Sequence, residues 1–291
     1  MIEQVKGTRN LFGADSEKYI HIFNTFCDAF INYGYELVEL PILEHKELFI
    51  KSIGENSEIV TKQMYEFKDK GDRSLVLRPE ATASVVRFHN EFFKNESKKY
   101  AYFGKMYRYE NPQKNRYREF IQAGAEIIGT IDDFSELQIL KSSIKFLEKL
   151  NIKAKLNINT IGSIEERKLY IKELDNYFKK NKNNLSKESN DKIGKNTLRI
   201  LDSNDPLDSE IIDLAPVIYQ YLEDDTLKRY EYLKDSLNKE NIDFVENSKL
   251  VRGLDYYNDL TFEFAYKATV LGGGGRYLSL IHISEPTRPI D

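Results

Sequence analysis

The residues best suited to chemistry lie within residues 100–129, where two segments of alternating polarity flank a link that contains proline and lysine. This pattern predicts two antiparallel strands joined by a long hairpin loop. Phe120, Gln122 and Glu126 occupy even positions of the second strand, so they project from one side of the sheet. Antiparallel pairing allows Arg108 of the first strand to lie on that side too. This face therefore combines a guanidinium, an aromatic ring, an amide and a carboxylate.

Two interpretations of this face are open. It does not suit a core, since ionised groups buried without partners cost several kcal/mol. The core face is instead expected at the apolar or small odd positions of the second strand, Ile121, Ala123, Ala125 and Ile127. The polar face is either the solvated outside of a hairpin or the floor of a ligand site. In the second case Arg108 would bind an anionic group and Glu126 a donor.

The segment before the hairpin combines helical and strand patterns. Apolar residues recur at helical spacing over residues 15–33, which predicts a helix that Asp15 or Ser16 caps and Gly34 ends. Residues 35–40 predict a strand that the following proline closes. Taken alone, this pattern is explained by an ordinary helix and edge strand with no special function.

A second group of elements leads to two further polar residues. Residues 64–67 and 74–77 predict strands around a tight turn, and residues 81–93 predict a helix. Glu80 precedes this helix and Thr82 lies in its first turn. An acid at a helix start is favourable to the helix dipole, so Glu80 has a structural explanation as well as a ligand-binding one.

The second half of the chain changes in composition. Residues 134–150 predict a helix and residues 153–158 a strand. Charged residues at helical spacing then dominate residues 164–247, which we interpret as a helical insertion. Its turns, rich in lysine and asparagine, are most simply solvated loops.

Two segments after the insertion could approach a ligand. Residues 252–257 read RGLDYY, and by themselves they could be a turn in which the paired tyrosines pack. Residues 272–275 are four consecutive glycines, which lose much backbone entropy on folding. They suit either a close approach to a ligand or a flexible hairpin link. Their spacing matches neither dinucleotide-binding nor phosphate-binding loops.

Composition limits the classes of function. The 291 residues are 41% hydrophobic and 12% aromatic, enough for one large domain or two modest ones. The net charge of −4 gives no global basic field, so any RNA contact must come from a local patch. A single cysteine, Cys27, suits a reducing compartment, and the four histidines show no zinc spacing. Neither a membrane-length apolar run nor a signal peptide is evident. We therefore expect a cytoplasmic protein without membrane association.

Several strings resemble one enzyme family. Residues 108–126, RYENPQKNRYREFIQAGAE, resemble motif 2 of the class II aminoacyl-tRNA synthetases, and in detail the histidyl-tRNA synthetases. RPEAT at residues 78–82 resembles an element that contacts the amino-acid substrate. RGLDYY resembles a block peculiar to histidyl-tRNA synthetases, and GGGGRY at residues 272–277 resembles the floor of the amino-acid pocket. The segment of residues 15–41 resembles motif 1, which builds the dimer interface. Lys6-Gly-Thr resembles the N-terminal element.

The resemblance implies a role for each matching residue. The implied catalytic residues, which would bind the α-phosphate and the developing charge, are Arg108 and Arg252. The implied ATP-binding residues, with the adenine stacked on the aromatic ring, are Arg108, Glu110, Arg116 and Phe120. The implied histidine-binding residues are Glu80, Ala81, Thr82, Gln122, Glu126, Tyr256, Tyr257, Gly273 and Gly274. In this scheme Glu126 and Tyr257 read the imidazole N–H.

The implied reaction is the ATP-dependent activation of L-histidine to histidyl-adenylate, followed by transfer to tRNA(His). It implies Mg²⁺ carried with ATP, no protein-bound zinc and a homodimer. The implied fold is α+β, with a class II synthetase-type antiparallel sheet flanked by helices and a helical insertion. Four positions depart from the family: Asn10 stands where Asp is common, Ala81 and Asn115 where glycine is usual, and Ile121 where histidine is common.

The resemblance divides the chain into parts. Residues 1–163 would be the first part of the catalytic core, residues 164–247 the insertion, and residues 248–277 the second part of the core. Residues 278–291 read LSLIHISEPTRPID and look like a non-native tail, with the third family motif and an anticodon-binding domain absent. We therefore expect aminoacylation by this chain to be impaired.

Two alternatives remain open at this stage. The first is the histidine-binding regulatory subunit of ATP phosphoribosyltransferase, a synthetase paralogue that does not aminoacylate. RPE, the complete motif 2 loop and RGLDYY favour the enzyme over that paralogue. The second is an inactive fragment that serves only in dimerisation or RNA binding.

Overall fold

A computed structural model describes residues 2–55, 57–111, 116–129, 134–252, 256–278 and 280. The chain forms two compact units. The first comprises Met1–Ile152 with Ser279–Asp291, and the second comprises Lys153–Leu278. Each unit contains sheets and helices, so the α+β class expected from the sequence is confirmed.

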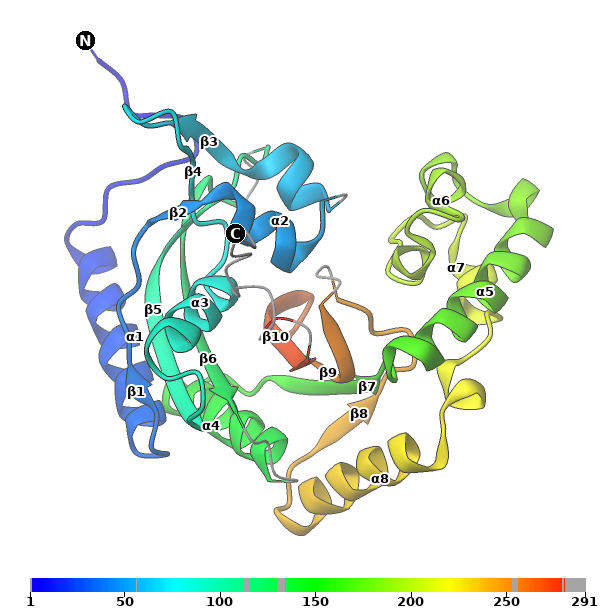
Figure 1. Cartoon of the computed structure of the whole chain (residues 1–291). Helices are drawn as coiled ribbons and strands as arrows, with labels where there is room; N and C mark the ends of the chain where they lie inside the picture. The colour runs from blue at the N-terminus through cyan, green and yellow to red at the C-terminus, as the bar shows by residue number, and fades with distance from the viewer. Residues whose placement is uncertain are drawn as a thin grey trace, which may run out of the picture. The chain divides into compact units, whose positions relative to one another are not determined.

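The first unit is built around the hairpin expected at residues 100–129. Strands β5 (Lys98–Tyr107) and β6 (Glu119–Ile128) pair antiparallel along their whole length, as predicted. Strand β1 (Glu36–Leu37) adds to the edge of β5 in parallel and is shorter than the predicted strand. Figure 1 shows the two long strands of the hairpin with β1 alongside.

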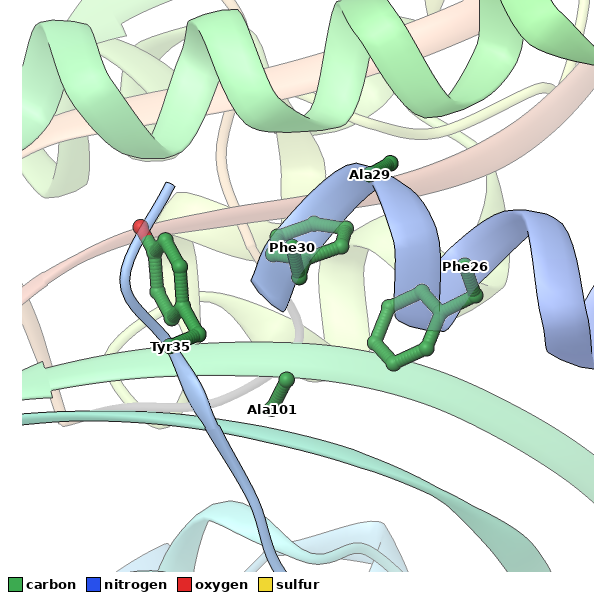
Figure 2. Packing of buried hydrophobic residues seen from close by; sticks show 5 residues of the cluster. All are labelled: Phe26, Ala29, Phe30, Tyr35 and Ala101. Carbon is green, nitrogen blue, oxygen red and sulfur yellow. The ribbon is translucent and has the colours of Figure 1, made fainter. Parts of the chain in front are cut away.

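The odd-numbered face of this hairpin lies against an aromatic core. Helices α1 (Ala14–Ile31) and α4 (Ser135–Lys149) pack on it. Figure 2 shows Phe26 and Phe30 of α1 above Ala101 of β5, with Tyr35 beside them. The part-buried residues packed against this cluster include Ala123, Ala125 and Ile127. The core face predicted for the second strand is therefore confirmed at these three positions.

The start of α1 differs from the prediction. Gly13 occupies the N-cap with a φ of 54°, a left-handed conformation that glycine adopts without strain, and no side chain caps the helix. Asp15 lies in the first turn instead, where its charge favours the helix dipole. At the other end Gly34 has a φ of 79°, which agrees with the predicted end of the helix.

A second, three-stranded sheet follows in the first unit, with strand order β2-β4-β3. Its strands are β2 (Leu43–His45), β3 (Tyr65–Lys68) and β4 (Ser74–Leu77). The helices around it are α2 (Lys46–Ile53), the π-helical turn η1 (Ile59–Gln63) and α3 (Thr82–Phe92). Buried Arg78, which follows β4, donates hydrogen bonds to the carbonyl oxygens of Leu40 and Pro41, in the segment before β2, and of Lys105 in β5 of the hairpin.

The second unit is a four-stranded sheet with helices between two of its strands. The strand order is β10-β9-β7-β8, and only β7 and β8 pair in parallel. The strands are β7 (Lys155–Thr160), β8 (Phe244–Glu246), β9 (Tyr257–Tyr266) and β10 (Thr269–Tyr277). Because β8 lies inside residues 164–247, that range is not wholly helical. The helical part ends at Lys239.

Buried carboxylates organise the helices of this unit. These helices are α5 (Ile164–Lys180), η2 (Lys182–Asn184), α6 (Lys187–Lys192), η3 (Thr197–Ile200), α7 (Ser209–Asp213), η4 (Ile218–Tyr221) and α8 (Asp224–Lys239). Glu166 forms a capping box with Ser163 and also accepts from Thr226 at the start of α8. Asp208 accepts from the Ser186 amide and from the hydroxyls of Ser186, Ser189 and Ser203. Burial alone would raise the pKa of Asp208, but these hydrogen bonds lower it below its ordinary value.

We expect Phe26→Ala to lower the free energy of unfolding by about 3–5 kcal/mol, because the ring is fully buried and its removal leaves a cavity. The matched control is Ile20→Ala on the same helix, where the side chain is 52% exposed and the loss should stay within about 0.5 kcal/mol. Urea unfolding followed by tyrosine fluorescence measures both, since the chain has no tryptophan. Equal losses in the two variants would contradict the packing described.

Candidate functional site

The even-numbered face of the β5–β6 hairpin carries the polar residues that the alternation predicted. The cross-strand neighbours on this face are Tyr100 and Glu126, Tyr102 and Gly124, Gly104 and Gln122, and Met106 and Phe120. Directly opposed residues of an antiparallel pair share a side of the sheet. Phe120, Gln122 and Glu126 therefore point to one side, away from the aromatic core.

Arg108 lies on the same side, just beyond the end of β5. Its amide donates to the carbonyl oxygen of Arg118, which continues the ladder by one step. Its guanidinium carbon stands 5.1 Å from the centre of the Phe120 ring, a cation–π contact. Its Nε donates to the carbonyl oxygen of Pro79 at 2.9 Å. The predicted proximity of Arg108 and Phe120 is therefore confirmed, and both lie next to the segment that precedes α3.

Glu126 is linked to that segment by a hydrogen bond. The Thr82 hydroxyl donates to Glu126 Oε1 at 2.8 Å, and both side chains are buried. A hydroxyl donor to a carboxylate is a charge-assisted bond, stronger than a neutral one. Two predicted histidine-binding residues from separate elements, one in α3 and one in β6, are thus held in direct contact.

Glu80 is only 2% exposed and adjoins this pair. Its two carboxylate oxygens accept from the backbone amides of Thr82 at 2.6 Å and Ala83 at 3.0 Å, at the start of α3. Glu80 therefore has the structural role expected of an acid at a helix start, because it satisfies amides that the helix leaves unpaired. Each oxygen keeps a second lone pair, so the carboxylate can also accept from a ligand.

The surroundings of Glu80 affect its pKa in both directions. Burial raises its pKa above the ordinary value, while the two amide donors and the Arg108 charge act in the opposite direction. Ala81, between Glu80 and Thr82, is fully buried, so all three residues of this predicted substrate-contacting segment are buried.

Gln122 is paired with a tyrosine that the sequence analysis missed. Its Nε2 lies 3.5 Å from the Tyr102 hydroxyl. Its Oε1 is buried and has no hydrogen-bond partner among the described residues. The Tyr102 ring lies across Gly124, where any side chain would collide with it. The signal was present, because Tyr102 has the same parity as Arg108 on the first strand.

The motif 2 loop is described only at its two ends. Arg116 NH1 stands 3.8 Å from Glu110 Oε2, which brings two predicted ATP-binding residues together. Arg118 and Glu119 donate through their amides to the carbonyl oxygen of Gly7, so the N-terminal segment lies along the start of β6. The predicted departure at Asn115 lies outside the described residues.

A second missed pair joins α3 to the hairpin. His89 Nδ1 and the Tyr100 hydroxyl are 3.1 Å apart, and both side chains are almost fully buried. Burial lowers the pKa of His89 and raises that of Tyr100 to about 12, so both groups are neutral at pH 7. His89 lies two turns after Thr82, and Tyr100 lies opposite Glu126. The two hydrogen bonds thus fasten one face of α3 to neighbouring residues of the sheet.

The remaining predicted residues lie in the second unit. Arg252 NH1 stands 3.4 Å from Glu263 Oε2, and its guanidinium crosses the backbone of Gly273. A Cβ on Gly273 would lie 2.7 Å from Arg252 NH1 and 2.9 Å from its Cζ. Tyr256 and Tyr257 are buried with ring centres 4.7 Å apart. Residues 253–255 of the RGLDYY block lie outside the described residues.

The four glycines are part of a strand rather than a hairpin link. All of them lie in β10 and pair with β9, while the turn between the two strands falls at residues 267–268. Side chains fold across their backbone: Arg252 at Gly273, the Phe262 ring at Gly274 and the Tyr257 ring at Gly275. Glycine is required at positions 273–275 because neighbouring atoms occupy the space of a Cβ there, whereas nothing lies within 4 Å of a Cβ at Gly272. The link interpretation is therefore wrong.

Within the described ranges, no three His, Cys, Asp or Glu side chains gather closely enough to hold a metal ion. The described helices also include none with the length and apolar character needed to cross a bilayer.

We expect Gly273→Ala to destabilise the protein by about 1–3 kcal/mol, because the new methyl group would overlap Arg252 and the Phe262 carbonyl. The matched control is Gly272→Ala, where nothing lies within 4 Å of the new atom. Thermal unfolding followed by circular dichroism compares the two. A Gly273→Ala protein as stable as Gly272→Ala would show that Arg252 does not lie over Gly273.

Comparisons with known proteins agree with this geometry. The family model for histidyl-tRNA synthetase matches residues 7–289, which extends past Tyr277, where we expected the resemblance to end. A histidine–tRNA ligase from Mycoplasma mobile is 40% identical over 97% of this chain and 65% of its own length. The apo histidyl-tRNA synthetase of S. aureus has a TM-score of 0.75 at 32% identity, covering 98% of this chain and 68% of that one.

A more distant structure shares the fold alone. It is an ATP phosphoribosyltransferase regulatory subunit/histidyl-tRNA synthetase from Bacillus halodurans, with a TM-score of 0.65 at 22% identity, covering 98% of this chain and 78% of that one. The chain spans about two thirds of the length of the curated relatives it matches. Given the family match along nearly all of its residues, the chain belongs to the histidyl-tRNA synthetase family.

Proposed function

We propose that the chain carries the core of a histidine–tRNA ligase, which activates L-histidine with ATP and transfers the histidyl group to tRNA(His). The observation that supports this best is the cluster on the even face of the hairpin. There the Thr82 hydroxyl donates to Glu126, Glu80 accepts from the Thr82 amide, and the charge of Arg108 acts on Glu80. A substrate that has both an ammonium and a carboxylate needs such a combination of acceptors and a cation.

Each group of the first unit has a defined task in this proposal. Glu80, Thr82 and Gln122 accept hydrogen bonds from the α-ammonium of histidine. Glu126 accepts from an imidazole N–H, which would reject side chains that lack a donor there. Arg108 binds the α-phosphate and the substrate carboxylate, since a planar guanidinium can contact two oxyanions at once. Phe120 stacks against the adenine.

The loop ends and the second unit supply further charges. Glu110 and Arg116 hold the base and the triphosphate, and Arg252 adds a cation for the developing charge. Gly273, Gly274, Tyr256 and Tyr257 serve the amino-acid side of the reaction. Mg²⁺ supplies charge neutralisation on the triphosphate when ATP is bound.

The reaction then depends on positioning and charge rather than on a covalent intermediate with the protein. The histidine carboxylate attacks the α-phosphate and pyrophosphate leaves. The ribose hydroxyl at the 3′ end of tRNA(His) then attacks the adenylate carbonyl, the anhydride bond to the phosphate breaks, and AMP leaves. Fixed cations at the phosphate stabilise the charge that develops in the first step. Lysines of the helical segment would contact phosphates of the tRNA, and the motif 1 segment would form a homodimer in the cytoplasm.

A second candidate is a histidine-binding regulatory subunit of ATP phosphoribosyltransferase. The fold it shares with the Bacillus halodurans structure favours considering it. Both functions need the acceptor cluster, but only the ligase needs Arg108, Phe120 and the motif 2 loop to hold ATP. The ligase is favoured because these groups are present together.

The decisive measurement is histidine-dependent exchange of pyrophosphate into ATP. We expect exchange by this chain extended with the C-terminal third of a full-length relative, and weaker exchange by the 291-residue chain alone. Histidine binding by both proteins without exchange by either would favour the regulatory subunit. If neither protein binds histidine and neither catalyses exchange, both proposed functions are ruled out.

We expect Glu126→Ala to weaken binding of L-histidine by about 10- to 150-fold, because a hydrogen bond to a charged group, of about 1.5–3 kcal/mol, is lost. The matched control is Glu119→Ala, an acid of the same strand on its opposite face that pairs with Lys105. Calorimetric titration with histidine compares the variants, and thermal unfolding excludes a folding defect. Unchanged histidine affinity in Glu126→Ala would contradict the assignment of the pocket.

A further inference from the structure

One acid beside the predicted catalytic residue Arg252 has no role in the scheme above. We propose that Glu263 is a positioning residue, which holds the Arg252 guanidinium against Gly273 in the orientation that its phosphate contact requires. This inference rests on the proposed ligase function for the role of Arg252, but the contact itself lies wholly within the second unit.

The ladder of β9 and β10 places the two supporting residues side by side. Glu263 and Gly273 are register partners, so they are directly opposite each other. Arg252 reaches across Gly273 to put NH1 3.4 Å from Glu263 Oε2. The two side chains are only 23% and 19% exposed. Partial shielding from water strengthens an ion pair relative to one on the open surface.

Gly273 provides the space for this contact. Because its missing Cβ would overlap the guanidinium, Arg252 can lie flat against the strand and still reach the carboxylate. Gly272, one residue earlier, has nothing within 4 Å of a Cβ and makes no such contact. Gly273, which the resemblance assigns to the amino-acid pocket, thus also leaves room for the Arg252 guanidinium.

The nitrogen donors of Arg252 have different surroundings. NH1 is directed to Glu263, while Nε is buried without a hydrogen-bond partner among the described residues. The guanidinium is planar and rigid, so fixing one nitrogen fixes the direction of the other donors. A buried donor without a partner is costly, and a phosphate oxygen would satisfy it. The pair with Glu263 therefore orients the donors that an anion would use.

Removal of the Glu263 carboxylate should affect ATP binding and the rate of the chemical step differently. Removing the Glu263 carboxylate raises the net positive charge around Arg252, so ground-state binding of ATP should not weaken. Losing the fixed orientation should slow the chemical step, because an error of about 1 Å in a positioned group can cost about 100-fold in rate. We therefore expect Glu263→Gln to lower kcat for ATP–pyrophosphate exchange by up to about 100-fold with KM for ATP unchanged or lower.

The control variants separate positioning from general damage. Glu263→Asp keeps the charge and should lose less activity than Glu263→Gln. Glu246→Gln removes a strand carboxylate that pairs with Lys234 and should leave kcat unchanged. In the Arg252→Ala background, adding Glu263→Gln should cause no further loss. A proportional loss of kcat in that background would show that Glu263 does not act through Arg252 and would overturn the proposal.

A second readout does not depend on activity. Modification by phenylglyoxal, followed by mass spectrometry of the peptide that contains Arg252, reports how firmly the guanidinium is held. We expect Arg252 to react several-fold faster in Glu263→Gln than in the wild type and in Glu246→Gln. Equal rates in all three proteins would overturn the proposal. Faster modification together with no exchange by the wild type would retain the positioning role and remove the ligase function instead.

Discussion

The register of the β5–β6 hairpin is the constraint on which the first unit depends. Its ladder runs without a shift from Lys98 opposite Ile128 to Tyr107 opposite Glu119. Because side chains alternate with a period of two, a slip of one residue would exchange the faces. Gln122 and Glu126 would then enter the aromatic core of α1 and α4, and unpaired buried charge is far too costly for that alternative. The aromatic core and the polar cluster therefore specify each other.

The second unit solves a related problem in a different way. Its β9–β10 ladder has register shifts between Val270 and Gly272 and between Gly275 and Arg276, on either side of the glycines. Between these irregular points the strand carries no side chains, and the vacant volume is filled from neighbouring residues. The polar group brought in this way is Arg252, and the apolar ones are the rings of Phe262 and Tyr257. The run of glycines thus reflects the side chains that pack over this part of the strand.

Periodicity predicted the features that depend on local pattern. The faces of β5 and β6, the helices at α1, α3 and α4, and the contact of Arg108 with Phe120 follow from alternation and helical spacing. Features that depend on distant partners were not predictable in the same way. β8 is too short to show a pattern and exists because it pairs with β7. The bond between His89 and Tyr100 joins residues whose local sequence gives no reason to connect them.

Glu80 illustrates why residue type alone leaves function open. The same carboxylate closes the start of α3 and adjoins the charge of Arg108. Helix capping and substrate recognition call for the same chemistry, an acceptor placed near donors, so sequence could not separate them. The structure indicates that they need not exclude each other, because capping leaves lone pairs on both oxygens.

The carboxylate of Asp208 has a consequence for the helical part of the second unit. Three serine hydroxyls and an amide converge on it, so segments near positions 186, 203 and 208 are joined by polar bonds in the interior. Its lowered pKa means that this contribution is complete above the ordinary Asp pKa and disappears as the solution becomes more acidic. Only acid stronger than the ordinary Asp pKa should therefore loosen this region as a separate cooperative block, while the aromatic core around Phe26 remains closed.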